Sequence, residues 1–377
     1  MAESIAVVQR TNETTGFTYF EWMGTDGPDV ITGFPDENND IYGLDGADDL
    51  RAGAGGFRGY LVGGEGDDTL RGGSAFDQLR GGPGGDLMMG GGDDDWYYVD
   101  SVDDVVFERL RWEPGRSGDS VLSDIDFSLA GLAVENLFLQ GSASEGIGNK
   151  FANQLYGNNG DNILDGGRGV DTLIGGDGND VYILRHARDF AEEPGSWTRQ
   201  KTLEAAQHGH DTVLAYNSFR LMAGVEDIFL QETFGKTGLL ISGLTAIGNH
   251  LDNRVTGNST ANNLNGRFGN DTLTGGDGAD AFIFSETLGA PNADLITDFR
   301  PGEDRIVISG ARVEVDSGPP DADAFHHGAE ATTAEHRMLF DGTTLRYDAD
   351  GTGAAAALDI AYFEDAPVLT AEDIFIT

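Results

Sequence analysis

The chain has 377 residues, no cysteine, and 65 acidic against 23 basic residues, which gives a formal net charge of −42. This charge excludes nucleic acid and anionic membranes as simple electrostatic partners and favours cations. The absence of cysteine excludes disulfides as a source of stability, and no stretch approaches the ~20 apolar residues that a transmembrane helix needs.

Residues 1–23 carry scattered apolar side chains and no repeat. We interpret them as a cap over the first coil of a repeat array, because the ends of a solenoid need closing. The segment lacks the basic region and the long apolar run of a secretory signal peptide. If the protein is secreted, we therefore expect a different export signal.

A first repeat block covers residues 24–98. Its strictest part, residues 63–98, reads GGEGDDTLR, GGSAFDQLR, GGPGGDLMM and GGGDDDWYY, four nine-residue units without a gap. Glycines allow tight bends and close approach of successive turns, and carboxylates with freed carbonyls are the oxygen ligands that Ca²⁺ prefers. A flexible glycine-rich linker has no reason to keep a fixed period. The sixth and eighth positions hold Asp68, Asp77, Asp86 and Asp95, and Leu70, Leu79, Met88 and Tyr97.

The earlier units of this block are less regular. Asp29, Asn39 and Asp48 hold their sixth positions. Residues 52–62 are two residues too long for one unit and place Gly59 in that position. We therefore expect one metal site to be lost on that side of the array.

Two copies of a longer cassette follow. Residues 118–140 resemble 209–231, and residues 146–184 resemble 246–284. Each copy ends in four units whose sixth positions are Asn153, Asn162, Asp171 and Asp180, or Asn253, Asn262, Asp271 and Asp280. Asn offers an oxygen without a charge, so the Asn-containing units are expected to bind calcium more weakly.

The stretches 99–147 and 185–247 have few glycines and show no regular aspartate spacing. We interpret them as β-coils without metal, packed by Val, Leu and Phe. Surface loops are expected at 108–118 and 192–209, and disorder at these two places is an equally good alternative.

The nonapeptide G-G-x-G-x-D-x-U-x resembles the calcium-binding repeat of RTX proteins. Residues 294–309 and 343–377 resemble the C-terminal domain of serralysin-type RTX exoproteins. The resemblance implies an all-β fold, a right-handed parallel β-roll solenoid with a C-terminal β cap. It also implies a type I secretion signal. The expected parts are a cap at 1–23, RTX blocks at 24–98, 148–184 and 248–284, metal-poor coils at 99–147 and 185–247, and the cap with the signal at 285–377.

In RTX proteins two units form one coil, and one Ca²⁺ lies between stacked turns. The second and fourth carbonyls and the Asp of one turn bind it together with the first and third carbonyls and the Asp of the next. The resemblance implies one such set at Gly64, Gly66, Asp68, Gly81, Pro83 and Asp86, and another at Gly73, Ala75, Asp77, Gly90, Gly92 and Asp95.

The same transfer implies further sets at Asn158, Gly160, Asn162, Gly175, Asp177 and Asp180, and at Asn258, Thr260, Asn262, Gly275, Asp277 and Asp280. It also pairs Asp29 with Asp48, Asp48 with Asp68, Asn153 with Asp171, and Asn253 with Asp271, for eight candidate sites. For the Asn-containing pairs, a hydrogen-bonded turn is an equally good alternative.

Catalytic motifs are incomplete. The sequence Gly235-Lys236-Thr237 has Leu230 where a phosphate-binding loop requires glycine. His208 and His210 are better explained as a solvated loop than as a zinc site. Asp348 and Asp350 begin an EF-hand-like loop that lacks its final Glu.

We therefore expect a secreted, non-catalytic calcium-binding RTX protein with a surface, matrix or adhesive role. A host- or membrane-interacting effector and a secreted enzyme with unrecognised catalytic residues are the alternatives. The expected partners are calcium ions, a type I exporter, and cell-surface polysaccharide or a second copy of the chain.

Overall fold

The computed structural model describes residues 5–14, 16–55, 57–108, 118–192, 209–289, 292–313 and 315–377. These residues contain no α-helix, and their one described 3-10 turn is η2 (Ala371–Asp373). No helix in them is long and apolar enough to cross a membrane. The chain divides into unit 1, residues 1–177, and unit 2, residues 178–377. Surface loops are predicted at 108–118 and 192–209, and residues 109–117 and 193–208 of them lie outside the described residues.

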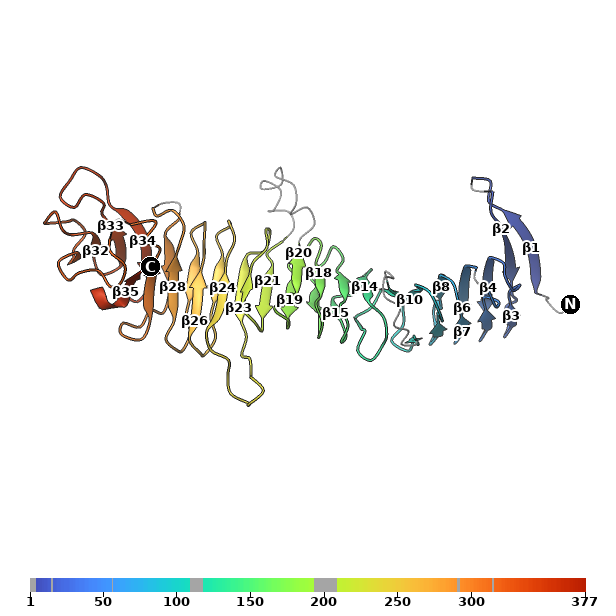
Figure 1. Ribbon diagram of the computed structural model, residues 1–377. Helices are drawn as coiled ribbons and strands as arrows, with labels where there is room; N and C mark the ends of the chain where they lie inside the picture. The colour runs from blue at the N-terminus through green and yellow to red at the C-terminus, as the bar shows by residue number, and fades with distance from the viewer. Residues whose placement is uncertain are drawn as a thin grey trace. The chain divides into compact units, whose positions relative to one another are not determined.

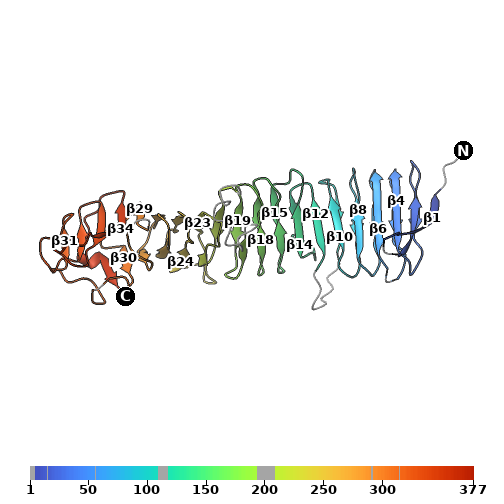
Figure 2. The ribbon, with the colours of Figure 1, turned by 90° about the horizontal axis from the view of Figure 1, so that it is seen from above.

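Unit 1 is a stack of short strands that lie side by side in successive coils (Figures 1 and 2). Three groups of hydrogen-bonded strands build it. The first runs through β1 (Ala6–Thr11), β2 (Thr18–Met23), β4 (Asn39–Asp45), β6 (Gly59–Glu65), β8 (Asp77–Arg80), β10 (Trp96–Val99), β12 (Ser120–Ser123), β14 (Asn136–Leu139), β16 (Gln154–Tyr156) and β18 (Thr172–Ile174).

The second group consists of β3 (Val30–Thr32), β5 (Asp49–Arg51), β7 (Thr69–Arg71), β9 (Leu87–Met89) and β11 (Val105–Val106). The third consists of β13 (Phe127–Ser128), β15 (Glu145–Ile147) and β17 (Ile163–Asp165). The strands pair in parallel, except for the antiparallel hairpin of β1 and β2.

The core of unit 1 is a row of apolar side chains that the strands of the coils direct inward. Leu61, Leu79 and Tyr97 are register partners on β6, β8 and β10, and all three are fully buried. Successive members of this row are 18 residues apart, so two nonapeptide units make one coil. The predicted all-β coil of parallel strands, with the eighth position of each unit inside, is confirmed.

The N-terminal hairpin extends the first group of strands beyond the first coil. Strand β2 pairs in parallel with β4, and every residue of β1 is exposed. Phe20 and Trp22 on β2 pack against Phe34, with ring centroids 4.7 and 4.9 Å apart.

Unit 2 continues the same construction. One group of strands runs through β19 (Val181–Leu184), β21 (Thr212–Ala215), β23 (Asp227–Leu230), β25 (Arg254–Thr256), β27 (Thr272–Thr274), β29 (Asp294–Ile296), β34 (Leu358–Phe363), β33 (Thr344–Tyr347), β32 (Met338–Phe340) and β31 (Phe325–His327). The other runs through β22 (Phe219–Arg220), β24 (Leu244–Ile247), β26 (Asn262–Asn265), β28 (Ala281–Phe284), β30 (Arg305–Ile308) and β35 (Ile374–Ile376). Strand β20 (Phe190–Glu192) also belongs to this unit.

The C-terminal residues complete both groups of unit 2. Strand β34 pairs in parallel with β29, and β35 pairs in parallel with β30. Strands β32, β33 and β34 then turn antiparallel, which ends the repetition of the coil. Phe299 packs between Phe282 of the last repeat and Phe363 of β34, with ring centroids 5.9 and 5.5 Å away. The predicted C-terminal β cap is confirmed.

Candidate metal centre

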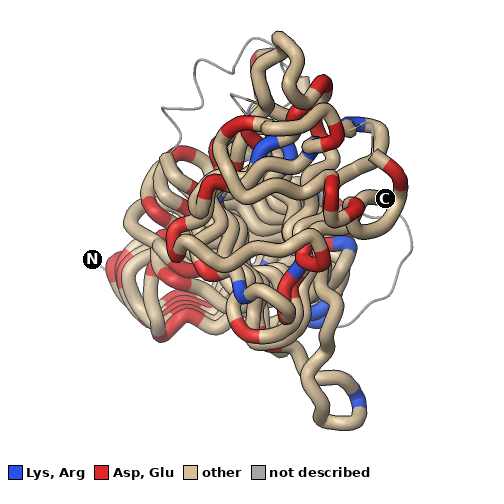
Figure 3. Tube along the Cα trace, turned by 90° about the vertical axis from the view of Figure 1, so that its left-hand side faces the viewer, with Lys and Arg blue, Asp and Glu red and all other residues tan. Residues whose placement is uncertain are grey.

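Aspartates stand directly before the strands and stack upon one another from coil to coil. The backbone N–H of Asp48 donates to Oδ1 of Asp68 at 2.8 Å, and the N–H of Asp68 donates to Oδ1 of Asp86 at 2.8 Å. The same bond joins Asp29 to Asp48 below and Asp86 to Asp104 above. Each carboxylate is therefore held by the coil that precedes it. Figure 3 shows how strongly acidic positions outnumber basic ones along the chain.

The second oxygen of these carboxylates has no hydrogen-bond donor. Oδ2 of Asp48, Asp68, Asp86 and Asp95 is buried and unpartnered, and the residues themselves are at most 3 % exposed. Oδ2 of Asp280 in unit 2 has the same surroundings. A buried carboxylate oxygen without a donor is costly, and a bound cation removes the cost.

Backbone carbonyls face the same space. A Cβ on Gly63 would collide both with Oδ2 of Asp68 and with the carbonyl oxygen of Gly81 in the next coil. Cβ atoms on Gly82 and Gly84 would likewise meet the carbonyl oxygens of Gly64 and Gly66. The carbonyls of Gly81 and Pro83 also accept the N–H groups of Gly64 and Gly66, but a carbonyl oxygen has a second lone pair, and carboxylate and carbonyl oxygens together form the hard-oxygen surroundings that suit Ca²⁺. The first predicted ligand set therefore fits the ion.

Burial changes the protonation of these groups. Desolvation raises the pKa of Asp68 to about 6 and that of Asp86 to about 7, while the backbone hydrogen bond to each carboxylate opposes the rise. Neighbouring carboxylates such as Asp104 raise the pKa of Asp86 further. Desolvation also raises the pKa of Asp95 to about 9. The stack of Asp29, Asp48, Asp68, Asp86 and Asp104 is called the carboxylate column below. Without metal, this column resists full ionisation near neutral pH.

Two predicted positions have partners of their own. Oδ2 of Asp77 accepts the N–H of Gly73, and Oδ1 accepts the N–H of Gly59. Oδ2 of Asp29 accepts both the N–H and the hydroxyl of Thr25, at 2.6 and 3.0 Å. Gly59 is the register partner of Asp77 in the preceding coil and carries no carboxylate. The coil therefore lacks an acidic ligand at the position where the sequence predicts that a metal site is lost.

Where asparagine replaces aspartate, both polar atoms of the side-chain amide form hydrogen bonds within the protein. In unit 1, Nδ2 of Asn153 donates to the carbonyls of Val134 and Glu135, at 3.2 and 3.1 Å, and Oδ1 accepts the N–H of Asn149. In unit 2, Nδ2 of Asn253 donates in the same way to the carbonyls of Val225 and Glu226. An amide donor therefore stands between carbonyls that would otherwise need a cation. This geometry favours the hydrogen-bonded alternative for Asn153 and Asn253.

The mixed Asn–Asp sets are only partly assembled within one unit. In unit 2, the N–H of Asn262 donates to Oδ1 of Asp280 at 2.7 Å. Cβ atoms on Gly257, Gly276 and Gly278 would meet the carbonyl oxygens of Gly275, Asn258 and Thr260. In unit 1, a Cβ on Gly157 would meet the carbonyl of Gly175 and Oδ1 of Asn162. Asp180 belongs to unit 2, so its pairing with Asn162 stays a prediction.

The carboxylate columns extend beyond the repeats, which the sequence analysis missed. Oδ1 of Asp119 accepts the N–H of Asp95 at 2.7 Å, and Oε2 of Glu135 accepts the N–H of Asp119 at 3.0 Å. Unit 2 repeats the pattern, because Asp211 accepts from Asp180 and Glu226 accepts from Asp211. The prediction that 99–147 and 185–247 lack aspartates in register is therefore wrong.

The irregular spacing does not disturb the pairing of the strands. Asp95 and Asp119 are 24 residues apart in place of 18, yet the strands that follow them stay in register. Glu135 reaches the same position with one more methylene. The signal was available, since both cassette copies place an acidic residue before one strand and a Glu before the next. Asp294 and Asp304 extend the columns of unit 2 past the last repeat in the same way.

The remaining candidates that lie in the described residues have local partners. Oδ1 of Asp348 accepts the N–H groups of Asp350 and Gly351 and so closes a turn. His210 lies 3.2 Å from a carboxylate oxygen of Asp227, and His208 lies outside the described residues.

Replacing Asp86 by Asn should weaken calcium binding at the centre of the strictest repeats. We expect the calcium concentration at half-folding to rise about tenfold, equivalent to about 1.4 kcal/mol, because one charged ligand is lost. The exposed Asp45→Asn is the matched control and should leave the midpoint unchanged, and Asn153→Ala should shift it less than Asp86→Ala. Circular dichroism during calcium titration measures all four variants. Equal midpoints for the Asp86 and Asn153 variants would show that the strong sites lie elsewhere.

The raised carboxyl pKa values predict opposite pH effects with and without calcium. The metal-free fold binds more protons than the unfolded chain between about pH 4 and 7, so its stability should fall as pH rises through that range. In calcium, folding instead starts from an unfolded chain whose carboxyl groups are already ionised above about pH 5, so the apparent calcium affinity should rise from about pH 3 to 5 and level off above that range. Calorimetry of calcium binding in two buffers of different ionisation enthalpy should detect proton release near pH 4 and little release at pH 7. Substantial proton release at pH 7 would contradict folding from an ionised, unfolded chain.

The RTX calcium-binding nonapeptide repeat model matches the chain in four copies, over residues 62–105, 147–182 and 252–285. The first matched segment continues past residue 98 to include Asp104, the last member of its carboxylate column. No curated protein matches the chain. The period, the converging oxygens and these matches together identify residues 62–105, 147–182 and 252–285 as RTX calcium-binding nonapeptide repeats, with several calcium ions as the cofactor.

Proposed function

We propose that the chain is a secreted, non-catalytic calcium-binding protein that folds when it binds Ca²⁺ outside the cell and has an adhesive or structural role there. Export through a type I system is part of the proposal. The observation that carries it is the column of buried carboxylates, because Oδ2 atoms such as those of Asp68 and Asp86 have no donor in the folded coil. Closing the coil without a cation brings these like charges together at close range.

The apolar core is too thin to offset this cost. Each nonapeptide contributes one fully inward side chain, as Leu70, Leu79 and Met88 illustrate. Ordering a glycine-rich chain costs more backbone entropy than ordering other residues. Low calcium in the cytosol and millimolar calcium outside would then separate an unfolded form from a folded one.

An outward row of aromatic side chains supports an adhesive role. On the first group of strands in unit 1, Tyr98, Phe138 and Tyr156 share one register line, with Leu122 between the first two. The rings of Phe138 and Tyr156 stack with centroids 4.5 Å apart and planes 4° apart. A row of half-exposed apolar side chains on a strongly acidic surface suits a neutral partner such as an uncharged polysaccharide.

Membrane contact is a second candidate, and one loop favours it. Residues 232–243 join β23 to β24 and project from the coil of unit 2 (Figure 1). Phe234 and Leu239 on this loop are 66 and 72 % exposed, and Leu240 and Ile241 are exposed beside them. Exposed apolar clusters of this kind mark interaction surfaces.

Removing calcium should unfold the chain. In excess chelator we expect a coil-like circular dichroism spectrum and a large hydrodynamic radius, because the uncompensated carboxylates repel one another. Adding calcium should restore the β spectrum and the compact form. A compact β spectrum in chelator would contradict folding on calcium binding.

Adhesion and membrane contact can be separated with two double variants of the calcium-loaded chain. We expect an insoluble neutral glucan to retain the protein, and Phe138→Ala with Tyr156→Ala to reduce retention at least tenfold. Phe234→Ser with Leu239→Ser is the matched control on the other unit and should leave retention unchanged. A second assay measures flotation of the same proteins with liposomes. If wild type floats, the Phe234→Ser with Leu239→Ser variant does not, and the Phe138→Ala with Tyr156→Ala variant keeps its glucan retention, then membrane contact replaces adhesion. Failure to bind any of a panel of neutral glucans also counts against adhesion.

A further inference from the structure

Three carboxylates meet at the place where the first repeat block ends. Asp95, Glu108 and Asp119 each have a carboxylate oxygen within 4.8 Å of the corresponding oxygens of the other two. Two ligands bound to one Ca²⁺ at 2.3–2.6 Å lie at most about 5 Å apart. The three oxygens thus already lie at a separation that one ion can bridge.

The three residues come from different parts of the coil. Asp95 precedes β10, Asp119 precedes β12, and Glu108 follows β11. The N–H of Asp95 donates to Oδ1 of Asp119, which fixes these two carboxylates one above the other. Asp119 in turn donates its N–H to Glu135, so the next coil holds it in place.

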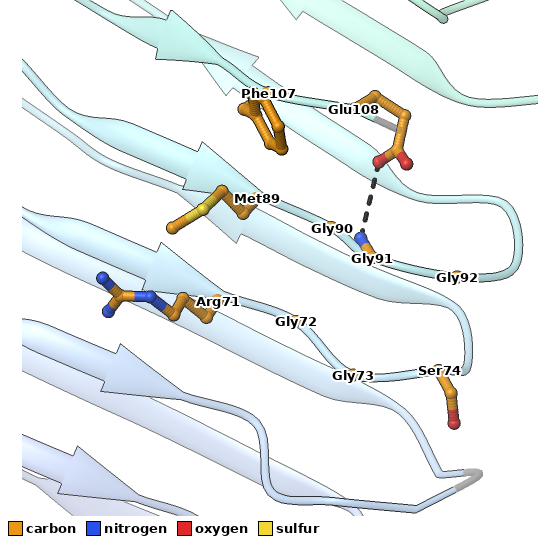
Figure 4. A pocket seen from close by; sticks show the side chains of 10 residues that line it. All are labelled: Arg71, Gly72, Gly73, Ser74, Met89, Gly90, Gly91, Gly92, Phe107 and Glu108. Carbon is orange, nitrogen blue, oxygen red and sulfur yellow. Dashed lines mark hydrogen bonds between the residues drawn. The ribbon is translucent and has the colours of Figure 1, made fainter. Parts of the chain in front are cut away.

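Glu108 occupies a special place in the repeat. It lies 18 residues after Gly90, where the next unit would have its first glycine. In the regular coils this position faces the column with its backbone carbonyl, as Gly81 faces Asp68. Here a carboxylate is added, and Oε2 of Glu108 accepts the N–H of Gly91 at 3.4 Å (Figure 4).

A buried oxygen without a partner points into the cluster. Asp95 is fully buried, and its Oδ2 has no hydrogen-bond donor. A Cβ on Gly90 would collide with this Oδ2 and with the Tyr97 hydroxyl alike, so the two oxygens share one space. The Tyr97 hydroxyl donates to Oε2 of Glu108 and accepts the N–H of Gly90 at 2.9 Å. This arrangement brings the Glu108 carboxylate beside the unpartnered oxygen.

We propose that Asp95, Glu108 and Asp119 form an additional calcium site that closes the first repeat block and differs in composition from the sites of the repeats. Three carboxylates supply its charge, with the Tyr97 hydroxyl oxygen nearby, whereas a repeat site combines two carboxylates with four carbonyls. Hard oxygen ligands select Ca²⁺ over softer metals, and the higher ligand charge strengthens binding. A cavity of about 290 Å³, lined by Met89, Phe107 and Glu108 among others, opens beside the cluster and admits solvent (Figure 4).

The inference rests on the calcium binding of the repeats, because Asp95 also belongs to a predicted repeat site. The test therefore changes the two residues that no repeat site uses. Native mass spectrometry of the full chain in calcium counts the ions bound to wild type, Glu108→Gln, Asp119→Asn and the double variant. Glu145→Gln, at an exposed position of unit 1, is the matched control.

Each single variant should lose one ion, and the double variant should lose that same one ion because both residues serve one site. Combining Glu108→Gln with Asp86→Asn should lose more ions than either change alone, because the two residues serve different sites. Circular dichroism in saturating calcium should show the β-roll in every variant. Glu145→Gln should keep the wild-type number.

The outcomes separate this site from the function proposed above. Wild-type protein that folds with calcium, while Glu108→Gln and Asp119→Asn keep every ion, overturns the additional site and leaves the proposed function standing. Two ions lost in the double variant overturn a single shared site. Wild-type protein that neither binds nor folds with calcium overturns both.

Discussion

The fold depends on buried carboxylates of which only one of the two oxygens accepts a hydrogen bond. One oxygen of Asp68 or Asp86 accepts a backbone N–H from the neighbouring coil, while the other is buried against carbonyl oxygens. Nearly all other features follow from this arrangement. The first glycine of each unit leaves room for the carboxylate, since a Cβ on Gly63 or Gly81 would occupy the place of Oδ2. The apolar strand residues then need only fill a narrow interior, and the free energy that the core does not supply must come from cations.

Asparagine shows the alternative solution to the same packing problem. Its Oδ1 accepts an N–H from its own turn, which Oδ2 of Asp68 and Asp86 does not, and its Nδ2 donates to carbonyls of the preceding coil, as at Asn153 and Asn253. A coil closed in this way satisfies its buried polar atoms without an ion. The chain thus combines coils that need a positive charge with coils that carry their own donors, and the Asp and Asn side chains that distinguish them differ in a single atom.

The sequence predicted those parts of the molecule in which residues 18 positions apart in the chain also stack on one another in the structure. The nine-residue period sufficed for the coil, for the inward side chains such as Leu79 and for the stacking of Asp68 beneath Asp86. It failed where additional residues change the spacing while the strands remain paired. Lengthening the connection between two strands costs little additional entropy, so Asp119 stacks on Asp95 although the repeat has been interrupted. The partners of Asp29 and Asp77 were also beyond prediction, because turn donors such as Thr25 depend on local backbone geometry.

The continuity of the columns gives the metal-poor stretches a mechanical role. In unit 1, hydrogen bonds run from Asp77 to Asp95, from Asp95 to Asp119 and from Asp119 to Glu135, across the end of the first block. The carbonyl of Glu135 then accepts from Asn153, the first asparagine of the next block. In a linear array, each coil gains stability only from its neighbours. A coil that lacks its own ion is therefore stabilised by a calcium-loaded coil on one side and an amide-closed coil on the other. Inserting loops between strands preserves that coupling, whereas inserting residues between a column residue and its strand would break it. This difference explains why the additional residues lie between strands while Asp95, Asp119 and Glu135 each stand directly before one.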